Sequence, residues 1–205
     1  MGIFKKYDIR GIYPDEIDED NTYRIARAYV ELIRKETGKN DLSFVVGRDM
    51  RLSSPQLTEK VIDGLTDGGA DVVDIGLAST PTFYFAVGKY GHDGGIQISA
   101  SHNPKEYNGL KLVREKAFPM GLENGLDWIR DNHKQEFKKY DKGRVDEEPG
   151  VVEEAVSYSK KFYKFDLKPL KVVCDVANAM SSIDLDSLFG ELPCELVRMN
   201  FELDG

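Results

Sequence analysis

One short segment holds the residues best suited to chemistry. Residues 99–104 read Ser-Ala-Ser-His-Asn-Pro, a run of small and turn-forming residues after an apolar run, which can present the hydroxyl of Ser101 to a cleft. His102 and Asn103 place donors beside it, and Lys111 further along can add a positive charge. A phosphoryl group moving onto or off a serine needs such donors and cations, because charge spread over its oxygens dominates the barrier. Taken alone, a Ser-His-Asn turn more often satisfies only backbone groups.

Two further segments place arginines near turns. Residues 7–11 read Tyr-Asp-Ile-Arg-Gly, in which the glycine lets the backbone turn while the guanidinium of Arg10 can point at an anion. Residues 46–55 contain Arg48 and Arg51 directly after an apolar run. By themselves, the first arginine is typical of a surface residue and the second pair is typical of a charged loop leading into a helix cap.

Apolar runs alternate with segments of helical periodicity, and this alternation predicts the elements that hold the loops. Strands and helices at this spacing form a three-layer α/β/α domain around a mixed, largely parallel sheet. Ligands bind beyond the carboxyl ends of the strands in such sheets, where residues 99–107 and 47–51 fall. The predicted helices are residues 22–37, 53–67 and 81–89, and the predicted strands are 43–46, 71–75, 95–98 and 109–113.

The composition changes after Trp128. Residues 132–150 are strongly polar and end in Pro-Gly, which makes them the best candidate for a domain boundary. We expect residues 1–148 to form a first domain and residues 149–205 to start a second α/β domain that is incomplete. In that second part the predicted helices are residues 151–162 and a stretch after Ser182, and the predicted strands are 171–175 and 195–199.

The overall charge and hydropathy exclude some partners. The 205 residues carry 28 Lys+Arg and 36 Asp+Glu, a formal net charge of −8. This acidic balance argues against nucleic acid, since sequence-independent binding needs a basic surface. No segment approaches the ~20 apolar residues that cross a membrane, and the first residues lack the apolar region of a signal peptide. We therefore expect a cytoplasmic protein with neither a nucleic-acid nor a membrane partner.

Other residues that could bind metals or form disulfides are expected to be structural. Cys174 and Cys194 lie in apolar runs and are expected to be buried free thiols. The acidic run at residues 15–20 precedes the first helix and is expected to cap it rather than to bind a metal. His92 and His133 have no Cys or His at metal spacing and are expected at the surface or in loops.

Together the three segments resemble one family, the α-D-phosphohexomutases. Their motifs occur in the order and spacing of that family's first domain, over residues 1 to about 145, and the resemblance continues more loosely through residues 172–178. The Tyr-Asp-Ile-Arg-Gly start and Tyr107 make the chain most similar to the phosphomannomutase/phosphoglucomutase branch. The motifs are Tyr-Asp-Ile-Arg-Gly, Val-Gly-Arg-Asp-x-Arg-x-Ser-Ser, Thr80-Pro81, and Ser-Ala-Ser-His-Asn-Pro with Tyr-Asn-Gly-x-Lys.

The resemblance implies a reaction and a role for each residue. Ser101 matches the serine that carries a phosphoryl group and donates it to the free hydroxyl of a hexose 1- or 6-phosphate. The bisphosphorylated sugar then turns over and returns the other phosphoryl, which interconverts the 1- and 6-phosphates of mannose, glucose or both. Arg10 and Lys111 match electrostatic stabilisers and candidate proton carriers, and His102 matches the histidine beside the serine. The substrate contacts implied in the same cleft are Tyr7 and Asn103.

The resemblance also implies Mg²⁺ and a longer protein. A serine phosphate carries about −1.5 to −2 charge at neutral pH, and Mg²⁺ suits its oxygens, so Ser101 is expected to reach the metal through its phosphate. The family's Asp-Gly-Asp-Gly-Asp-Arg metal loop and its distal sugar- and phosphate-binding loops do not occur in these 205 residues. We therefore expect an N-terminal portion whose partners are the missing C-terminal domains and a hexose phosphate, with little or no mutase turnover alone. Residues 178–182 also depart from the family's Asn-Gly-rich turn.

Two other functions are weighed against the mutase. A non-catalytic phosphate-sugar-binding or regulatory module that retains the fold would leave Ser101 unphosphorylated. A serine hydrolase is disfavoured, because the sequence has no Gly-x-Ser-x-Gly elbow and His102 is a neighbour in sequence rather than a base across a cleft.

Overall fold

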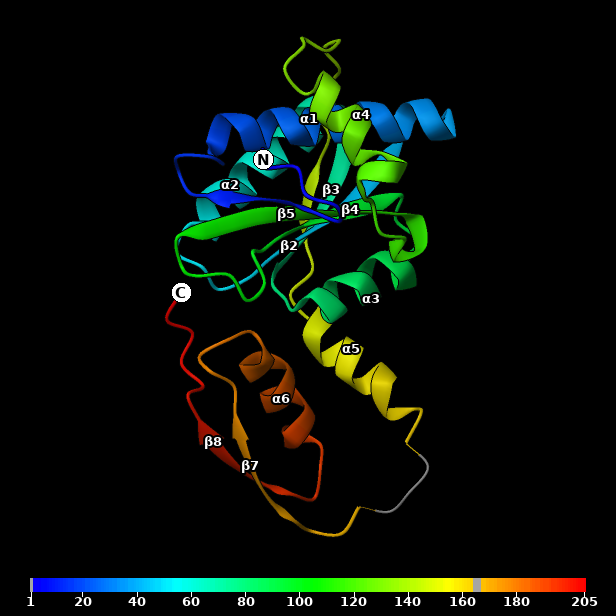
Figure 1. The fold of residues 1–205 in the computed structure, drawn as a ribbon. Helices are drawn as coiled ribbons and strands as arrows, with labels where there is room; N and C mark the ends of the chain where they lie inside the picture. Colours follow the sequence, from blue (N-terminus) through cyan, green and yellow to red (C-terminus); the bar gives the residue numbers. More distant parts are fainter. Residues whose placement is uncertain (1, 164–166) are drawn as a thin grey trace.

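The computed structural model describes residues 2–163 and 167–205, which form two parts joined by a helix (Figure 1). The first part is built on a six-stranded sheet. The second holds the two-stranded parallel sheet of β7 (Lys171–Asp175) and β8 (Glu195–Met199) with the helix α6 (Ser181–Gly190). No helix among these residues has the length and apolar composition needed to span a membrane.

The large sheet has the strand order β1-β5-β4-β2-β3-β6. Of its six strands only β5 runs against the others, since β4, β2, β3 and β6 pair in parallel and β5 pairs antiparallel with both β4 and β1. The predicted mixed, largely parallel sheet is therefore confirmed. The strands are β1 (Ile9–Ile12), β2 (Leu42–Arg48), β3 (Ala70–Leu77), β4 (Gly94–Ile98), β5 (Tyr107–Arg114) and β6 (Val145–Glu147).

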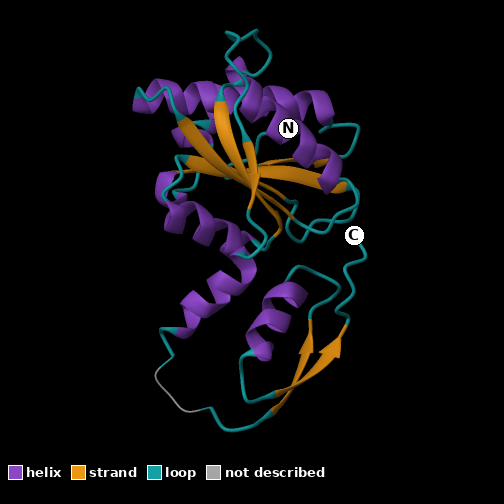
Figure 2. Cartoon of the chain, turned by 180° about the vertical axis from the view of Figure 1, so that it is seen from behind, coloured by secondary structure: helices purple, strands orange, loops and turns teal. Residues whose placement is uncertain are grey.

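Helices cover both faces of this sheet, which confirms the three-layer arrangement (Figures 1 and 2). The helices α1 (Glu19–Thr37), α2 (Ser54–Asp67) and α4 (Leu126–Asn132) pack on one face, and α3 (Thr80–Tyr90) packs on the other. On the first face the rings of Tyr29 and Phe44 meet at 4.9 Å between centroids. On the second, Phe83 is fully buried against Val45 and Val113. Two single 3₁₀ turns, Glu115–Ala117 and Leu122–Asn124, lie between β5 and α4.

The acidic run at residues 15–20 caps α1, as predicted. The Asp18 carboxylate accepts a hydrogen bond from the Asn21 backbone N–H at 2.7 Å, and Glu19 and Asp20 occupy the first turn, where carboxylates complement the helix dipole. Because of this cap the helix begins three residues before the predicted start. It ends at Gly38, whose φ of 70° is a left-handed conformation that glycine adopts freely.

The polar segment 132–150 is more than a linker. Its strand β6 adds to the edge of the large sheet, with Val145 opposite Val72, and the Arg144 guanidinium lies 2.8 Å from the Asp71 carboxylate. The exposed sequence Val-Asp-Glu has no apolar periodicity, so nothing in it predicts a strand. Helix α5 (Val151–Lys160) follows and ends two residues before the predicted limit. It packs on α3, with Lys89 2.8 Å from Glu154 and the tilted rings of Phe85 and Tyr158 5.3 Å apart between centroids.

The second part follows the predicted order of β7 (Lys171–Asp175), α6 (Ser181–Gly190) and β8 (Glu195–Met199). Cys174 and Cys194 are free thiols as predicted, but they are half-buried rather than buried. The reason is that a two-stranded sheet with one helix cannot enclose them. His133 lies in the turn after α4, which agrees with a loop residue, but it is buried rather than at the surface, with its Nδ1 2.9 Å from the carbonyl oxygen of Arg130.

His92 is a half-buried titratable group that we expect to make the stability of the fold depend on pH. Its ring is half-buried before β4, with Nδ1 3.1 Å from the Ser43 hydroxyl, and burial lowers the pKa of His92 below its usual 6.5, against a weaker opposing effect of Asp93. Because the unfolded state then takes up a proton more readily, we expect the free energy of unfolding to fall as the pH drops below 6.5. An NMR titration of the His92 ring should give a midpoint below 6.5, and His92→Gln should flatten that part of the stability profile. A midpoint at or above 6.5 would show that burial is not the dominant effect.

Candidate active site

A cavity of 260 Å³ lies at the carboxyl ends of β2, β3 and β4. This is the edge of the sheet at which the sequence predicts a ligand site. Ser99 and Ser101 line it after β4, and residues of α6 close it from the second part of the chain. The remaining lining residues used below are Asp49, Gln97 and Asp184.

Ser101 presents its hydroxyl at the surface of this cavity. The residue is exposed and its φ is 56°, a left-handed conformation that is uncommon outside glycine. Its backbone N–H donates to the Ser99 hydroxyl at 3.0 Å, and its own Oγ lies 3.3 Å from the Nδ1 atom of His102. The imidazole is therefore close enough to exchange a proton with the hydroxyl.

Arg10 and Asn103, both predicted site residues, contact each other. A terminal nitrogen of Arg10 donates to the Asn103 side-chain oxygen at 2.5 Å, and another forms an ion pair with Asp8. Because Arg10 lies opposite Gly109 in the register of β1 and β5, the strand pairing brings it beside the loop. The side-chain oxygen of Asn103 is thus occupied in holding Arg10, and its amide nitrogen makes no hydrogen bond among the described residues.

Lys111 lies on the same sheet face as Arg10. It is directly opposite Gln97, which lines the cavity, and two residues along β5 from Gly109, the partner of Arg10. Side chains opposite each other in an antiparallel pair, or two apart on one strand, share a face. Within the described ranges the Lys111 ammonium makes no ion pair or hydrogen bond, so its charge is not neutralised by a carboxylate of this part of the chain.

Tyr7 is the predicted site residue that the structure does not connect to the loop. Its side chain is 64% exposed, and the contact its ring makes is with the Lys6 ammonium, 5.1 Å from the ring centroid. Across residues 2–163 and 167–205 no hydrogen bond joins Tyr7 to Ser101 or its neighbours. Its role in substrate binding stays a prediction.

The sequence places Arg51 in a charged loop that leads into a helix cap, but it gives no sign of the part that Arg51 takes in this site. Its side chain is 5% exposed and donates four hydrogen bonds to backbone carbonyls of the 99–107 loop, at 2.6 to 3.0 Å. Asp49 faces it at 3.3 Å. A loop arginine among polar residues gives no sign of burial, because its partners are backbone groups about 50 residues away.

A side-chain contact joins the two parts of the chain beside the cavity. The Thr82 hydroxyl at the start of α3 donates to the Asp184 carboxylate of α6 at 3.1 Å. Asp184 also lines the cavity, so the second part contributes to the site. The sequence separation of 102 residues hides this pair from any local pattern.

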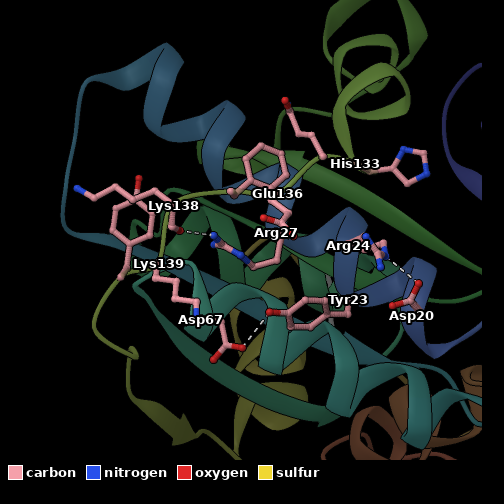
Figure 3. A pocket seen from close by; sticks show the side chains of 12 residues that line it. Asp20, Tyr23, Arg24, Arg27, Asp67, His133, Glu136, Lys138 and Lys139 are labelled. Atoms are coloured by element: carbon pink, nitrogen blue, oxygen red, sulfur yellow. Dashed lines mark hydrogen bonds and ion pairs between the residues drawn. The ribbon is translucent and has the colours of Figure 1, made fainter.

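A wider cavity of 640 Å³ lies elsewhere, between α1 and residues 133–140 (Figure 3). Most of its charged groups already have partners. Tyr23 donates to Asp67 at 3.0 Å, and Arg24 pairs with Asp20 at 2.7 Å. The terminal nitrogen of Arg27 donates to the Lys138 carbonyl at 2.8 Å. Its lining holds no serine, threonine or cysteine among the described residues, so its volume alone does not make it the site of a phosphoserine.

The residues present do not by themselves form a magnesium site. No group of three or more His, Cys, Asp or Glu side chains among those described is arranged to hold a metal ion. Asp49 lies at the cavity, but its two oxygens face Arg51 and the Ser54 hydroxyl.

Comparison with known proteins gives a consistent result. Residues 1–139 match the family model described as phosphoglucomutase/phosphomannomutase, alpha/beta/alpha domain I. The chain is 39% identical over 212 aligned residues to a phosphomannomutase of Vibrio cholerae, covering 98% of this chain and 45% of that protein. A phosphomannomutase of Klebsiella pneumoniae is 51% identical over 123 residues, covering 60% of this chain and 74% of its own length.

The fold is similar to that of solved structures as well. A phosphoglucomutase/phosphomannomutase family protein of Burkholderia thailandensis superposes with a TM-score of 0.87 at 33% identity, covering 98% of this chain and 44% of the other. The chain thus spans a little under half the length of this structure and of the Vibrio protein.

Proposed function

Because the chain belongs to the phosphoglucomutase/phosphomannomutase family, we propose that it forms the phosphoserine-bearing part of an enzyme that interconverts hexose 1-phosphate and hexose 6-phosphate. The hexose is mannose, glucose or both. The observation that carries the proposal is the exposed Ser101 hydroxyl at the carboxyl ends of three parallel strands, beside His102 and in the same loop as Asn103, which binds Arg10.

The chemistry follows from the groups around this hydroxyl. In the loading direction, Ser101 Oγ forms a bond to the phosphorus of a hexose bisphosphate, the bond from phosphorus to the sugar oxygen breaks, and the serine proton ends on that oxygen. Arg10 and Lys111 supply positive charge on one sheet face, where the negative charge of the transferring group must be stabilised. His102, 3.3 Å from Oγ, is a further candidate carrier of the proton besides Arg10 and Lys111. In the reverse step the phosphoryl group passes from Ser101 Oγ to a free hydroxyl of a hexose monophosphate, and the proton of that hydroxyl returns to the serine oxygen.

The proposal extends to parts that these residues do not supply. Mg²⁺ is proposed as the cofactor, held in part by the phosphate oxygens of Ser101, since hard oxygen ligands suit it. The carboxylates it requires are not grouped anywhere among the described residues. We therefore expect these 205 residues alone to give little continuous turnover, and we assign the rest of the site to the domains that the longer relatives contain.

The test is the phosphorylation state of Ser101. Intact mass spectrometry of the purified protein, before and after incubation with a hexose 1,6-bisphosphate, should detect one covalent phosphate, and peptide mapping should locate it on Ser101. Ser101→Ala should remove it, and the control variant Ser159→Ala, at an exposed serine of α5, should keep it. A chain that binds hexose phosphate equally well with alanine at position 101, and never takes up phosphate, would instead be a non-catalytic binding module.

A further inference from the structure

The 99–107 loop is wrapped around the guanidinium of Arg51. One terminal nitrogen donates to the carbonyls of Pro104 and Tyr107 at 2.7 and 3.0 Å. The other donates to the carbonyls of Ser101 and Asn103 at 3.0 and 2.6 Å. All four terminal N–H groups of the Arg51 guanidinium therefore donate to carbonyl oxygens of this one loop.

This arrangement determines which way the loop faces. Because four carbonyl groups converge on a buried cation, the opposite side of the loop, including the Ser101 hydroxyl, is turned toward the surface. Ser101 itself has a left-handed backbone, which an L-residue adopts only when its surroundings hold it there. Its own carbonyl is one of the four that Arg51 binds.

Asp49 in turn holds Arg51 in place. Its Nε lies 3.3 Å from an oxygen of Asp49, and the other oxygen of Asp49 accepts from the Ser54 hydroxyl at 2.6 Å and from the Arg51 backbone N–H at 3.1 Å. Asp49 is anchored to the sheet by its backbone N–H, which donates to the Ile98 carbonyl at 2.9 Å. Both side chains are about 95% buried, so they form a rigid link from the sheet to the loop.

We propose that Arg51 is a positioning residue for phosphoryl transfer: its guanidinium sets the curvature of the 99–107 loop and so places the Ser101 hydroxyl relative to Arg10 and Lys111. The catalytic consequence rests on the proposed function, whereas the hold on the loop does not. A lysine cannot replace it, because an ammonium has three donors on one point and cannot span four carbonyls in a plane.

Residue-resolved amide hydrogen exchange tests the hold on the loop. The amides of Ser101, Asn103 and Tyr107 each donate a hydrogen bond within the loop, at 3.0, 3.1 and 3.0 Å. In Arg51→Lys we expect these amides to exchange roughly tenfold faster, while amides of β2 and β3 stay within about twofold of the unaltered protein. The control is Arg27→Lys, because Arg27 is just as buried and donates to a carbonyl far from this loop. It should leave the three loop amides unchanged.

A second measurement, the rate of phosphate uptake, tests whether the position of the loop affects phosphoryl transfer. Phosphate uptake by Ser101 from a hexose 1,6-bisphosphate should be about tenfold slower in folded Arg51→Lys and unaltered in Arg27→Lys. If the unaltered protein takes up no phosphate, the proposed function fails, and amide exchange still decides whether Arg51 holds the loop. Uptake at the normal rate in Arg51→Lys, or loop amides that do not change, would overturn the positioning role.

Asp49→Asn keeps the test decisive if Arg51→Lys does not fold. The amide preserves one oxygen for Ser54 and the Arg51 backbone, and it removes the charge that faces the guanidinium. We expect the same three loop amides to exchange about threefold faster, with β2 and β3 unchanged. No change in the loop, or an equal rise throughout the sheet, would count against Arg51 as the residue that holds it.

Discussion

Replacing Lys111 by methionine is expected to slow phosphorylation of Ser101 by about a hundredfold or more. Methionine keeps the length and much of the apolar stem of lysine, so the sheet is preserved while the charge is lost. That charge lies on the Arg10 face of β5 without a carboxylate partner among the described residues. The measurement is the first-order rate at which the purified chain gains one phosphate from excess hexose 1,6-bisphosphate, followed by intact mass.

Lys105→Met is the matched control for this prediction. Lys105 is exposed in the 99–107 loop that carries Ser101, and it makes no ion pair in the described part of the chain. The variant therefore tests the effect of losing one nearby positive charge at the surface. Its rate should stay within about threefold of the unaltered chain. Equal rates in Lys111→Met and Lys105→Met would remove Lys111 from the proposed site.

The second large effect is expected at Gly109, in the middle of β5. A methyl group there would overlap the carbonyl oxygen of Ile9. It would also lie 3.1 Å from the backbone carbonyl oxygen of Ser99 and 3.2 Å from Arg10 Cα. These are backbone atoms of the neighbouring chain segments, so no side-chain movement can relieve the overlap. Gly109→Ala should lower the free energy of unfolding by about 4 kcal/mol or more, measured by urea denaturation.

Gly88→Ala provides the comparison. Gly88 is exposed in α3, and a methyl group added there would meet no atom within 4 Å. Alanine should raise the free energy of unfolding by about 0.5–1 kcal/mol, because it restricts the unfolded chain and favours the helix. A mild loss in Gly109→Ala, comparable in size to the gain in Gly88→Ala, would mean that β1 can shift away without cost. Since Gly109 lies between Arg10 and Ser99, the same close approach brings the predicted site residues together.

Much of the fold could be predicted from local patterns. The periodic apolar residues of α1 and the short apolar runs of β2, β3 and β4 are strong signals. In a helix with one buried face the apolar residues recur about every 3.6 residues, and in a strand buried on both faces they form a continuous run. Chain order then places the ends of parallel strands on one edge of the sheet, which is why the sequence alone predicts a ligand site at the loop that carries Ser101.

The missed features depend on partners distant in sequence. Arg51 lies in a polar loop, and its burial follows from carbonyl groups contributed by residues 101–107. Strand β6 is exposed on both faces and carries no apolar pattern. His133 is polar, yet the end of α4 offers its ring backbone acceptors that offset burial. In each case a tertiary contact outweighs what the local residues indicate.

The left-handed backbone at residue 101 sets two demands on one position. Glycine would adopt that conformation without penalty, whereas an L-residue there costs about 1 kcal/mol. Yet glycine has no side-chain atom that could hold a phosphoryl group, whereas serine offers its hydroxyl oxygen. The backbone conformation therefore favours glycine at this position, whereas the proposed chemistry requires serine. A Ser101→Gly substitution would remove the conformational penalty and, with it, the hydroxyl that accepts the phosphoryl group.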